Sequence, residues 1–217
     1  MGRQSGRSLG NSEASGQKSE MSRSETIEPE MLLQAYQRGL FPMAETDESG
    51  NECISWYAPD PRGVIPLDGF HIPRGMKRIL KKEEYEIQMD TDFPAVIAGC
   101  ADRAETWISH GIQASYFHLH ELGWAHSVET WYREELVGGL YGVAIGGAFF
   151  GESMFSRRTD ASKVALVHLV THLRANGFVL LDTQWLNPHL EQFGCIEISR
   201  ERYMKELAAA LQAEGRF

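Results

Sequence analysis

Apolar residues recur at helical spacing where the folded part of the chain begins. One stripe is formed by Met31, Leu32, Ala35 and Tyr36. Pro29 suits the first turn of such a helix and Gly39 its end. A polar turn over residues 45–51 and a short strand over residues 54–57 follow. Residues 1–26, by contrast, are rich in Ser and Gly and almost lack large apolar side chains, so we expect a disordered leader there.

The remainder of the chain alternates between helical and strand patterns. Helices are expected over residues 73–82, 92–100 and 111–122, with a strand over residues 85–89. Strand patterns over residues 125–132, 136–144 and 148–155 are joined by turns short enough for hairpins, and they predict an antiparallel meander. A helix that Thr159 or Asp160 would cap, a buried strand over residues 178–181, a short helix near His189, a strand over residues 196–199 and a final helix complete the pattern.

This order of elements predicts the α+β class, with a mixed, largely antiparallel sheet flanked by helices. We place a boundary near residue 61, between a small N-terminal lobe over residues 27–61 and a main domain over residues 62–217. The order is compatible with the N-acetyltransferase (GNAT-type) architecture, and equally with other α+β folds.

Composition excludes several classes of protein. The 217 residues contain three cysteines and no CxxC pair, which argues against a disulfide framework and a cysteine-rich zinc site. No stretch approaches the roughly 20 apolar residues that cross a bilayer, and we expect no signal peptide because the first residues lack an apolar segment. We therefore expect a cytoplasmic protein away from membranes. A net charge of −9 argues against indiscriminate nucleic-acid binding.

One segment departs from this acidic balance. Residues 62–82 carry a net charge of +5, which leaves −14 on the rest of the chain. Within it, Arg74, Arg78 and Lys81 recur at i, i+4 and i+7 of the expected helix. A solvated helix face is the ordinary interpretation of such a stripe. A single cationic helix on an anionic protein also indicates a site for a phosphate backbone.

Two acidic positions could take part in chemistry. Glu152 lies among aromatic residues, so its carboxylate would be partly desolvated and would need a cationic or N–H partner. A structural salt bridge would satisfy it equally well. Asp182 and Gln184 follow a buried strand on one face, where they could orient and partly deprotonate an amine. Asp182 could also simply cap or begin a turn.

Other polar and aromatic residues offer weaker signals. Gly151-x-Ser153 lacks the second glycine of a nucleophile elbow, because Phe155 stands in its place. His118 and His120 fall on different faces of a helix, so we assign no metal. Trp107 follows a charged loop, where an indole could stack on a nucleobase, although a core position is the ordinary role of such a residue.

Eight short motifs, taken in order, resemble one family. They are YQRGLFP at 36–42, WYAPDPR at 56–62, TWI at 106–108, HSVE at 126–129, GGLYG at 138–142, GESMFS at 151–156, ASK at 161–163 and DTQ at 182–184. Each motif is weak alone, but the ordered set is specific. Over residues 28–204 the chain resembles the bacterial leucyl/phenylalanyl-tRNA–protein transferases.

The resemblance implies a fold and an activity. Such enzymes are cytoplasmic, and their larger domain is acetyltransferase-like. They move Leu or Phe, and less efficiently Met, from aminoacyl-tRNA to the N-terminal amine of proteins that begin with Arg or Lys, within the N-end rule degradation pathway. No metal or small cofactor is implied, because the aminoacyl ester is already activated. We expect a monomer.

The resemblance also implies residue roles. Arg74, Arg78 and Lys81 match the family's tRNA-binding cluster, and Trp107 matches a residue near the 3′-terminal adenosine. Asp182 and Gln184 match the proposed catalytic pair, in which Asp182 polarises Gln184, and Glu152 matches the acid beside the acceptor peptide. The pocket for the transferred side chain corresponds to Leu140, Phe149, Leu173, Leu181 and Met43.

Two residues depart from the pattern of the family, and two other functions are to be weighed against aminoacyl transfer. Met43 and Leu173 stand where some family members have Trp and Phe, which bears on adenosine stacking and on the choice between Leu and Phe. An acetyl-CoA-dependent N-acetyltransferase on the same fold would need a glycine-rich pyrophosphate loop, and residues 157–161 lack its glycines. A non-catalytic RNA-binding module would leave Glu152, Asp182 and Gln184 without a role.

Overall fold

The computed structural model describes residues 26–217, so the expected leader over residues 1–26 lies outside the described residues except for its last position. An N-terminal segment contains α1 (Pro29–Gln37), β1 (Phe41–Thr46) and β2 (Glu52–Tyr57). The expected helix and second strand are confirmed, and the hairpin adds β1, which the sequence pattern did not predict. Pro42 and the uneven alternation of residues 41–46 obscure that strand until its partner is known.

The rest of the described chain adds seven strands and six helices around one sheet. They are β3 (Arg62–Ile65), α2 (Arg74–Leu80), β4 (Glu86–Met89), α3 (Phe93–Ala101), α4 (His110–Glu121), β5 (Ala125–Tyr132), β6 (Glu135–Ile145), β7 (Ala148–Ser156), α5 (Ala161–Ala175), β8 (Leu180–Gln184), α6 (Pro188–Glu191), β9 (Ile196–Ile198) and α7 (Arg200–Ala210). The predicted helices, the meander and the later strands are confirmed, with ends shifted by a few residues. β3 was not predicted.

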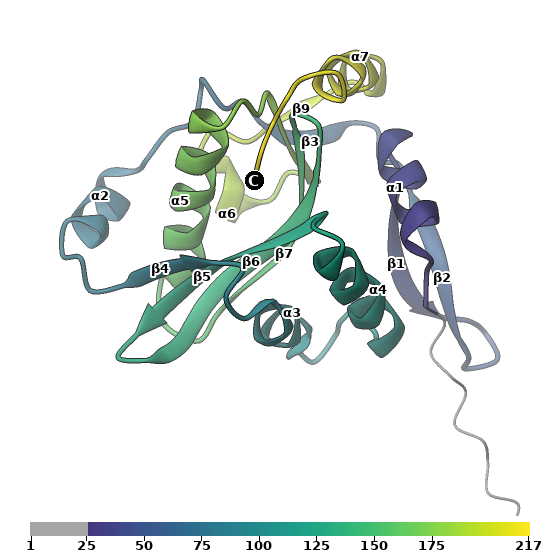
Figure 1. Cartoon of the computed structure of the whole chain (residues 1–217), viewed down its shortest axis with the longest axis horizontal. Helices are drawn as coiled ribbons and strands as arrows, with labels where there is room; N and C mark the ends of the chain where they lie inside the picture. Colours follow the sequence, from purple (N-terminus) through teal and green to yellow (C-terminus); the bar gives the residue numbers. More distant parts are fainter. Residues whose placement is uncertain (1–25) are drawn as a thin grey trace, which may run out of the picture.

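Within the described residues the large sheet has the strand order β4-β5-β6-β7-β8-β3-β9. β7 and β8 pair in parallel, and the other neighbouring strands pair antiparallel. Helix α5 lies on one face of this sheet, and α3 and α4 cover the other, with α1 beside them (Figure 1). The chain thus has the mixed, helix-flanked sheet of the α+β class that the sequence predicted.

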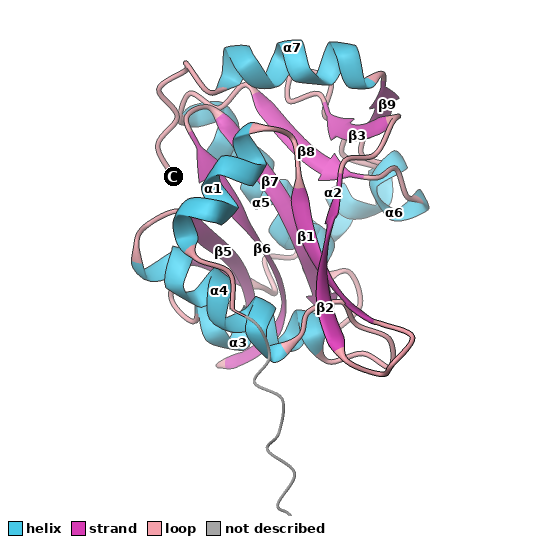
Figure 2. Ribbon diagram, turned by 90° about the vertical axis from the view of Figure 1, so that its right-hand side faces the viewer, coloured by secondary structure: helices cyan, strands magenta, loops and turns pink. Residues whose placement is uncertain are grey.

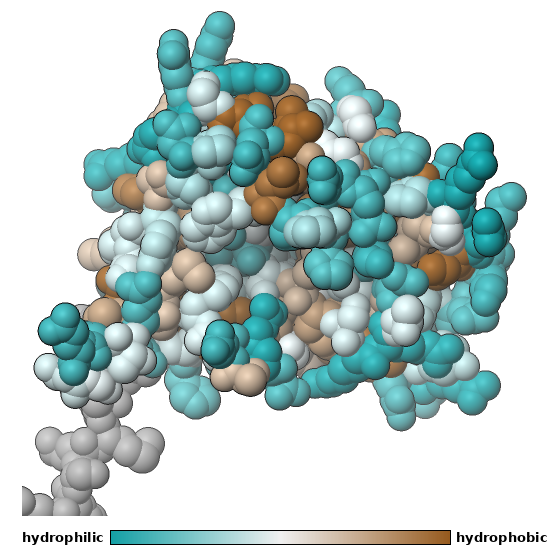
Figure 3. Space-filling view, turned by 180° about the vertical axis from the view of Figure 1, so that it is seen from behind, coloured by the Kyte–Doolittle hydropathy of each residue, from teal (hydrophilic) through white to brown (hydrophobic). Residues whose placement is uncertain are grey.

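Two buried clusters correspond to the two faces. The first joins α1, α3, α4 and α7 and includes Tyr36, Phe41, Tyr116, Phe150 and Tyr203. The second packs α5 against the sheet through Leu140, Phe149, Leu166, Leu169 and Leu181. Helix α7 crosses one end of the sheet beside β8, as a second view shows (Figure 2). On the side opposite to Figure 1, hydrophobic residues form small, separate surface patches among hydrophilic ones (Figure 3).

The N-terminal segment is joined to the sheet by packing. Ile27, Leu32, Tyr36 and Phe41 belong to the same buried cluster as residues of α3, α4 and β7. β3 begins directly after residue 61 and enters the large sheet. The division of the chain into a lobe and a main domain at that residue stays a prediction.

Candidate functional site

A cavity of about 640 Å³ opens where β7 and β8 separate. The two strands pair in parallel only from Ala148↔Leu180 to Phe150↔Asp182. Beyond that point both strands continue, and residues of both strands line the cavity. Parallel strands that pair and then diverge leave backbone and side chains facing the gap, so this is the place where the sheet can receive a ligand.

The cavity has an apolar wall. Its apolar lining includes Leu140, Leu166, Leu169, Leu181 and Leu190. Two of the expected pocket residues, Leu140 and Leu181, are therefore in it. Phe149 and Leu173 are fully buried in the same core cluster but do not line the cavity, and Met43 packs against the other cluster. The structure thus brings two of the five expected residues to the cavity surface.

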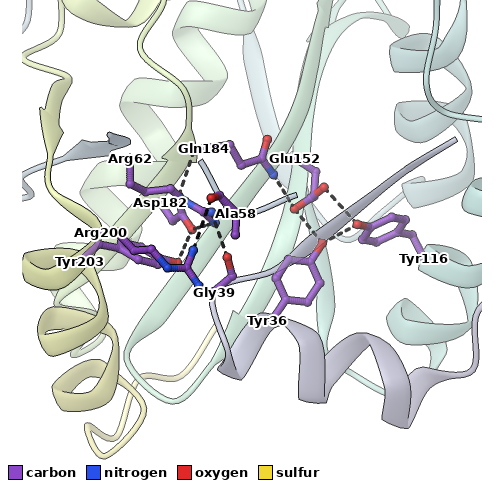
Figure 4. Close-up of polar contacts among 10 residues, drawn as sticks. All are labelled: Tyr36, Gly39, Ala58, Arg62, Tyr116, Glu152, Asp182, Gln184, Arg200 and Tyr203. Atoms are coloured by element: carbon purple, nitrogen blue, oxygen red, sulfur yellow. Dashed lines mark hydrogen bonds and ion pairs between the residues drawn. The ribbon is translucent and has the colours of Figure 1, made fainter. Parts of the chain in front are cut away.

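The carboxylate of Asp182 accepts hydrogen bonds from two side chains and from the backbone (Figure 4). The Arg62 guanidinium donates to both carboxylate oxygens, from Nε to Oδ1 at 2.9 Å and from Nη2 to Oδ2 at 2.6 Å. The Tyr203 hydroxyl donates to Oδ2 at 2.6 Å. Asp182 and Arg62 are 0% and 1% exposed, so this is a buried, bidentate ion pair.

The guanidinium of Arg62 is held from other sides as well. Its Nη1 donates to the Gly39 carbonyl at 3.0 Å, and its Cζ lies over the Phe41 and Tyr203 rings. Burial by itself lowers the pKa of Arg62, but hydrogen bonding and Coulombic attraction to Asp182 outweigh this, and the pKa is raised. Arg62 thus remains a fixed cation that keeps the Asp182 carboxylate in place.

Asp182 positions Gln184 through the backbone. Asp182 Oδ1 accepts the Gln184 backbone N–H at 2.8 Å, and Trp185 N–H donates to Thr183 O at 2.7 Å. Gln184 has φ +65°, a left-handed conformation that a non-glycine residue adopts only when its surroundings hold it. The expected contact in which Asp182 polarises the Gln184 side chain is absent among the described residues, because that amide points toward Glu152.

A glycine makes this turn possible. A Cβ on Gly63 would lie 2.5 Å from the Trp185 carbonyl carbon, so β3 can approach residues 184–186 only without a side chain there. The close approach of β3 also brings Arg62 within hydrogen-bond distance of Asp182. The short strand β3 therefore supplies the glycine that leaves room for residues 184–186 and the cation that holds Asp182, which in turn binds the Gln184 backbone.

Gln184 and Glu152 meet inside the cavity wall. Gln184 Nε2 donates to Glu152 Oε1 at 2.9 Å. No donor among the described residues is hydrogen-bonded to Gln184 Oε1, and Gln184 lines the cavity. The amide oxygen is therefore able to accept a hydrogen bond from a ligand.

Glu152 is the extra residue of a β-bulge between β6 and β7. Tyr141 pairs with Ser153 and Gly142 with Gly151, so Glu152 has no partner in the ladder. The bulge turns its carboxyl group toward two phenols from α1 and α4. Oε1 lies 2.7 Å from Tyr36 Oη and Oε2 lies 3.0 Å from Tyr116 Oη, and the two phenol oxygens are hydrogen-bonded to each other.

None of the ion pairs among the described residues involves Glu152, so the structural salt bridge that the sequence left open is not formed. Burial raises the pKa of Glu152 to about 7, against the lowering effect of its hydrogen bonds to the two tyrosines and Gln184. Its carboxyl group therefore titrates near neutral pH.

The predicted RNA-contacting residues lie on α2 and at the cavity. Arg74 and Arg78 of α2 and the adjoining Lys81 are exposed, while Met76 is buried against α5. Since α2 packs on α5, whose residues Ser162 to Leu169 contribute to the cavity, the basic helix and the cavity share one supporting helix. Trp107 lines the cavity, as do the cationic Arg103 and Lys163.

Sequence reasoning missed four residues of this site as functional candidates: Tyr36, Arg62, Tyr116 and Tyr203. Tyr36 and Arg62 lie within two of the family motifs, which was the available signal. Tyr116 and Tyr203 belong to helical patterns that read as ordinary core positions, and no local signal marks them.

No helix within residues 26–217 is long and apolar enough to cross a membrane. Across the same residues, no group of three or more His, Cys, Asp or Glu side chains is arranged to hold a metal ion. His126 is hydrogen-bonded to Asp90 at 2.7 Å.

Comparison with known proteins supplies the family. A family model described as leucyl/phenylalanyl-tRNA protein transferase matches residues 64–208, and its N-terminal domain model matches residues 25–60. A leucyl/phenylalanyl-tRNA–protein transferase of Ruegeria pomeroyi is 52% identical over 192 residues, which cover 88% of this chain and 90% of the relative. One of Akkermansia muciniphila is 55% identical over 192 residues, covering 87% and 98%.

The chain belongs to the leucyl/phenylalanyl-tRNA–protein transferase family. It is a transferase, and the name of its relatives supports transfer of an aminoacyl group, with aminoacyl-tRNA and a protein acceptor as partners. Among solved structures, that of a functionally unknown conserved protein from Staphylococcus epidermidis is similar with a TM-score of 0.44 and 11% identity, over 81% of this chain and 66% of that one.

Proposed function

We propose that this enzyme transfers Leu or Phe, and also Met, from aminoacyl-tRNA to the N-terminal amine of proteins that begin with Arg or Lys, and so marks them for N-end rule degradation. The observation that carries the proposal is the cavity itself, which joins an apolar wall to the buried polar pair Gln184 and Glu152. We further propose the GNAT-type architecture, supported by the cavity between the diverging parallel strands β7 and β8.

The chemistry requires no external activation. The acceptor nitrogen attacks the ester carbonyl carbon, the bond from that carbon to the ribose oxygen breaks, and a proton passes from nitrogen to the departing oxygen. An α-amine has a pKa near 8, so a useful fraction is already neutral at cellular pH. The free Oε1 of Gln184 would accept a hydrogen bond from the amine and aim its lone pair, so positioning supplies much of the rate.

The apolar wall would hold the transferred side chain. Leu140, Leu166 and Leu181 line a slot that suits side chains unbranched or branched beyond Cβ. Ile and Val are wider near Cα and have stiffer χ1 angles, which disfavours them. Phe149 and Leu173 would act from the layer packed around these residues.

The basic helix would guide the tRNA. Exposed Arg74, Arg78 and Lys81 are suited to phosphate contacts near the mouth of the cavity, and Trp107 would contact the 3′-terminal adenosine. Replacing the three basic residues by Ala should weaken tRNA binding and lower the slope of log Kd against log salt by about 2. The control replaces Arg202 and Lys205 of α7 and Arg216 near the end of the chain, and should leave that slope unchanged. Equal slopes for the wild type and both variants would reject tRNA contacts by Arg74, Arg78 and Lys81.

A transfer assay tests the whole proposal. The protein is incubated with tRNA carrying labelled Leu and with a peptide that begins with Arg, and label is followed into the peptide. Asp182→Ala should abolish transfer and retain tRNA binding, because Gln184 then loses the contact that holds its backbone. The surface variant Asp47→Ala should transfer normally. Transfer of an acetyl group from acetyl-CoA instead, or tRNA binding without transfer, would replace the proposal by the corresponding alternative.

A further inference from the structure

Glu152 is a buried carboxyl group without a cation. Its residue is 7% exposed, and the neighbours that reach its oxygens are two phenols and one amide. Such an environment provides hydrogen bonds but no compensating charge. A carboxylate enclosed in this way is costly to ionise.

The arrangement of oxygens sets the number of protons needed. Tyr36 Oη, Tyr116 Oη and the Glu152 carboxyl form a closed triangle with three oxygen–oxygen contacts. Each contact needs one proton between its oxygens, whereas the two phenols supply two. With Glu152 ionised, both phenols donate to the carboxylate and the contact between them contains no hydrogen. With Glu152 protonated, all three contacts are hydrogen bonds around a ring.

Burial and one neighbouring charge favour the protonated form. Asp182, on the neighbouring strand, acts on Glu152 as a like charge, whereas the guanidinium of Arg62 attracts Glu152 but is hydrogen-bonded to Asp182. Tyr141 of β6 contributes a buried, unpartnered hydroxyl. Arg103, after α3, points its guanidinium at the Cys100 carbonyl and the Ser153 hydroxyl. Burial is the largest influence on the pKa of Glu152 and raises it to about 7.

We propose that the resting enzyme holds Glu152 as a neutral acid inside a hydrogen-bonded ring with Tyr36 and Tyr116, and that the cationic first side chain of an acceptor ionises it on binding. This rests on the proposed function, which brings an N-terminal Arg or Lys to the cavity. The step balances simply: Glu152 loses one proton to the buffer and becomes the counter-ion of the acceptor cation. No bond other than O–H is broken.

The hydrogen-bonded ring determines which first side chains of an acceptor Glu152 can recognise. Below about pH 7 most resting molecules have an uncharged Glu152, so this acid then leaves no unpaired buried charge in the empty cavity. A guanidinium then lowers the carboxyl pKa, and ionisation near neutral pH needs little free energy because the resting pKa is already close to 7. A neutral first residue cannot induce this ionisation, so the ring discriminates by charge.

The first experiment examines the free protein. Glutamate carboxyl carbons are labelled with ¹³C, and their NMR shifts are followed from about pH 5 to pH 9. One resonance should titrate near pH 7, and it should be absent from Glu152→Gln. If that variant does not fold, the wild-type titration still decides: glutamates that all titrate below about pH 5.5 would overturn the ring.

The second experiment measures protons released on binding. An Arg-first peptide is titrated into the enzyme by calorimetry, in buffers of different ionisation enthalpy, without tRNA. At about pH 6 the peptide should release close to one proton from Glu152, and at about pH 8.5 almost none. Its affinity should rise about tenfold per pH unit between pH 5 and 7. A citrulline-first peptide, isosteric and neutral, should release none and bind more weakly.

The two experiments separate the ring from the proposed function. Normal binding of the Arg-first peptide with the same proton release in wild type and Glu152→Gln would overturn the coupling. Failure of the peptide to bind would reject the acceptor step, whereas the NMR titration would still establish or reject the neutral ring. A midpoint near pH 7 together with proton release confined to Arg- and Lys-first peptides is the expected result.

Discussion

Asp182 and Glu152 stand on adjacent strands of one sheet, and both are buried, yet their surroundings differ in one respect. Asp182 has the fixed cation Arg62 on both of its oxygens. Glu152 has only phenols and an amide. A guanidinium stabilises a charged group that serves as a structural support, whereas uncharged donors leave a group that titrates near neutral pH. Two similar side chains thus acquire different tasks from their neighbours.

Removing the cation should have the largest effect. In Arg62→Met the Asp182 carboxylate stays buried without its ion-pair partner, so the free energy of unfolding should fall by about 3–5 kcal/mol. Urea denaturation at neutral pH measures this. Arg202→Met, which breaks a surface pair with Glu206 at 2.8 Å, is the control and should cost less than about 1 kcal/mol. Equal losses in the two variants would mean that Arg62 does not support a buried charge.

Removing the titrating group should change how stability depends on pH. The folded-state pKa of Glu152, about 7, is above the ordinary value of 4.5. The folded protein therefore keeps a proton that the unfolded chain loses, and this contribution is complete below about pH 4.5 and is lost as the pH rises through 7. Relative to Glu152→Gln, the wild type should lose of the order of 3 kcal/mol between pH 4.5 and 8.

Urea denaturation at several pH values compares these two proteins. Glu206→Gln, at the surface, serves as the control and should show the same pH dependence as the wild type. If the wild type and Glu152→Gln instead gave parallel curves, Glu152 would have an ordinary pKa and the contrast with Asp182 would disappear.

Weakening the support of Asp182 without removing its cation should have a smaller effect. Tyr203→Phe deletes one hydrogen bond to Asp182 Oδ2 while both bonds from Arg62 remain. The expected loss is about 1.5 kcal/mol in the free energy of unfolding, since the acceptor is charged. Transfer activity should fall by less than in Asp182→Ala, because the bond to the Gln184 backbone is kept. A complete loss of transfer in Tyr203→Phe would assign that hydroxyl a direct role in the reaction.

Much of the fold could be predicted because its elements have strong local patterns. The meander over β5, β6 and β7 alternates over long stretches and is separated by short turns, and α5 has a wide apolar stripe. β3 has neither property. It is four residues long and wholly buried, and it begins with Arg62, whose burial depends on a partner 120 residues away. Long-range pairing of this kind has no local pattern.

The candidate site divides in the same way. The sequence alone determined the family, the acidic and amide residues that enter the cavity, and the exposed basic helix, because motifs and helical spacing are local properties of the chain. Only the tertiary structure decided which groups surround them: Arg62 and Tyr203 at Asp182, Tyr36 and Tyr116 at Glu152, and the Gln184 amide turned from Asp182 to Glu152. Charge state depends on neighbours in space, and those come from strands and helices far apart along the chain.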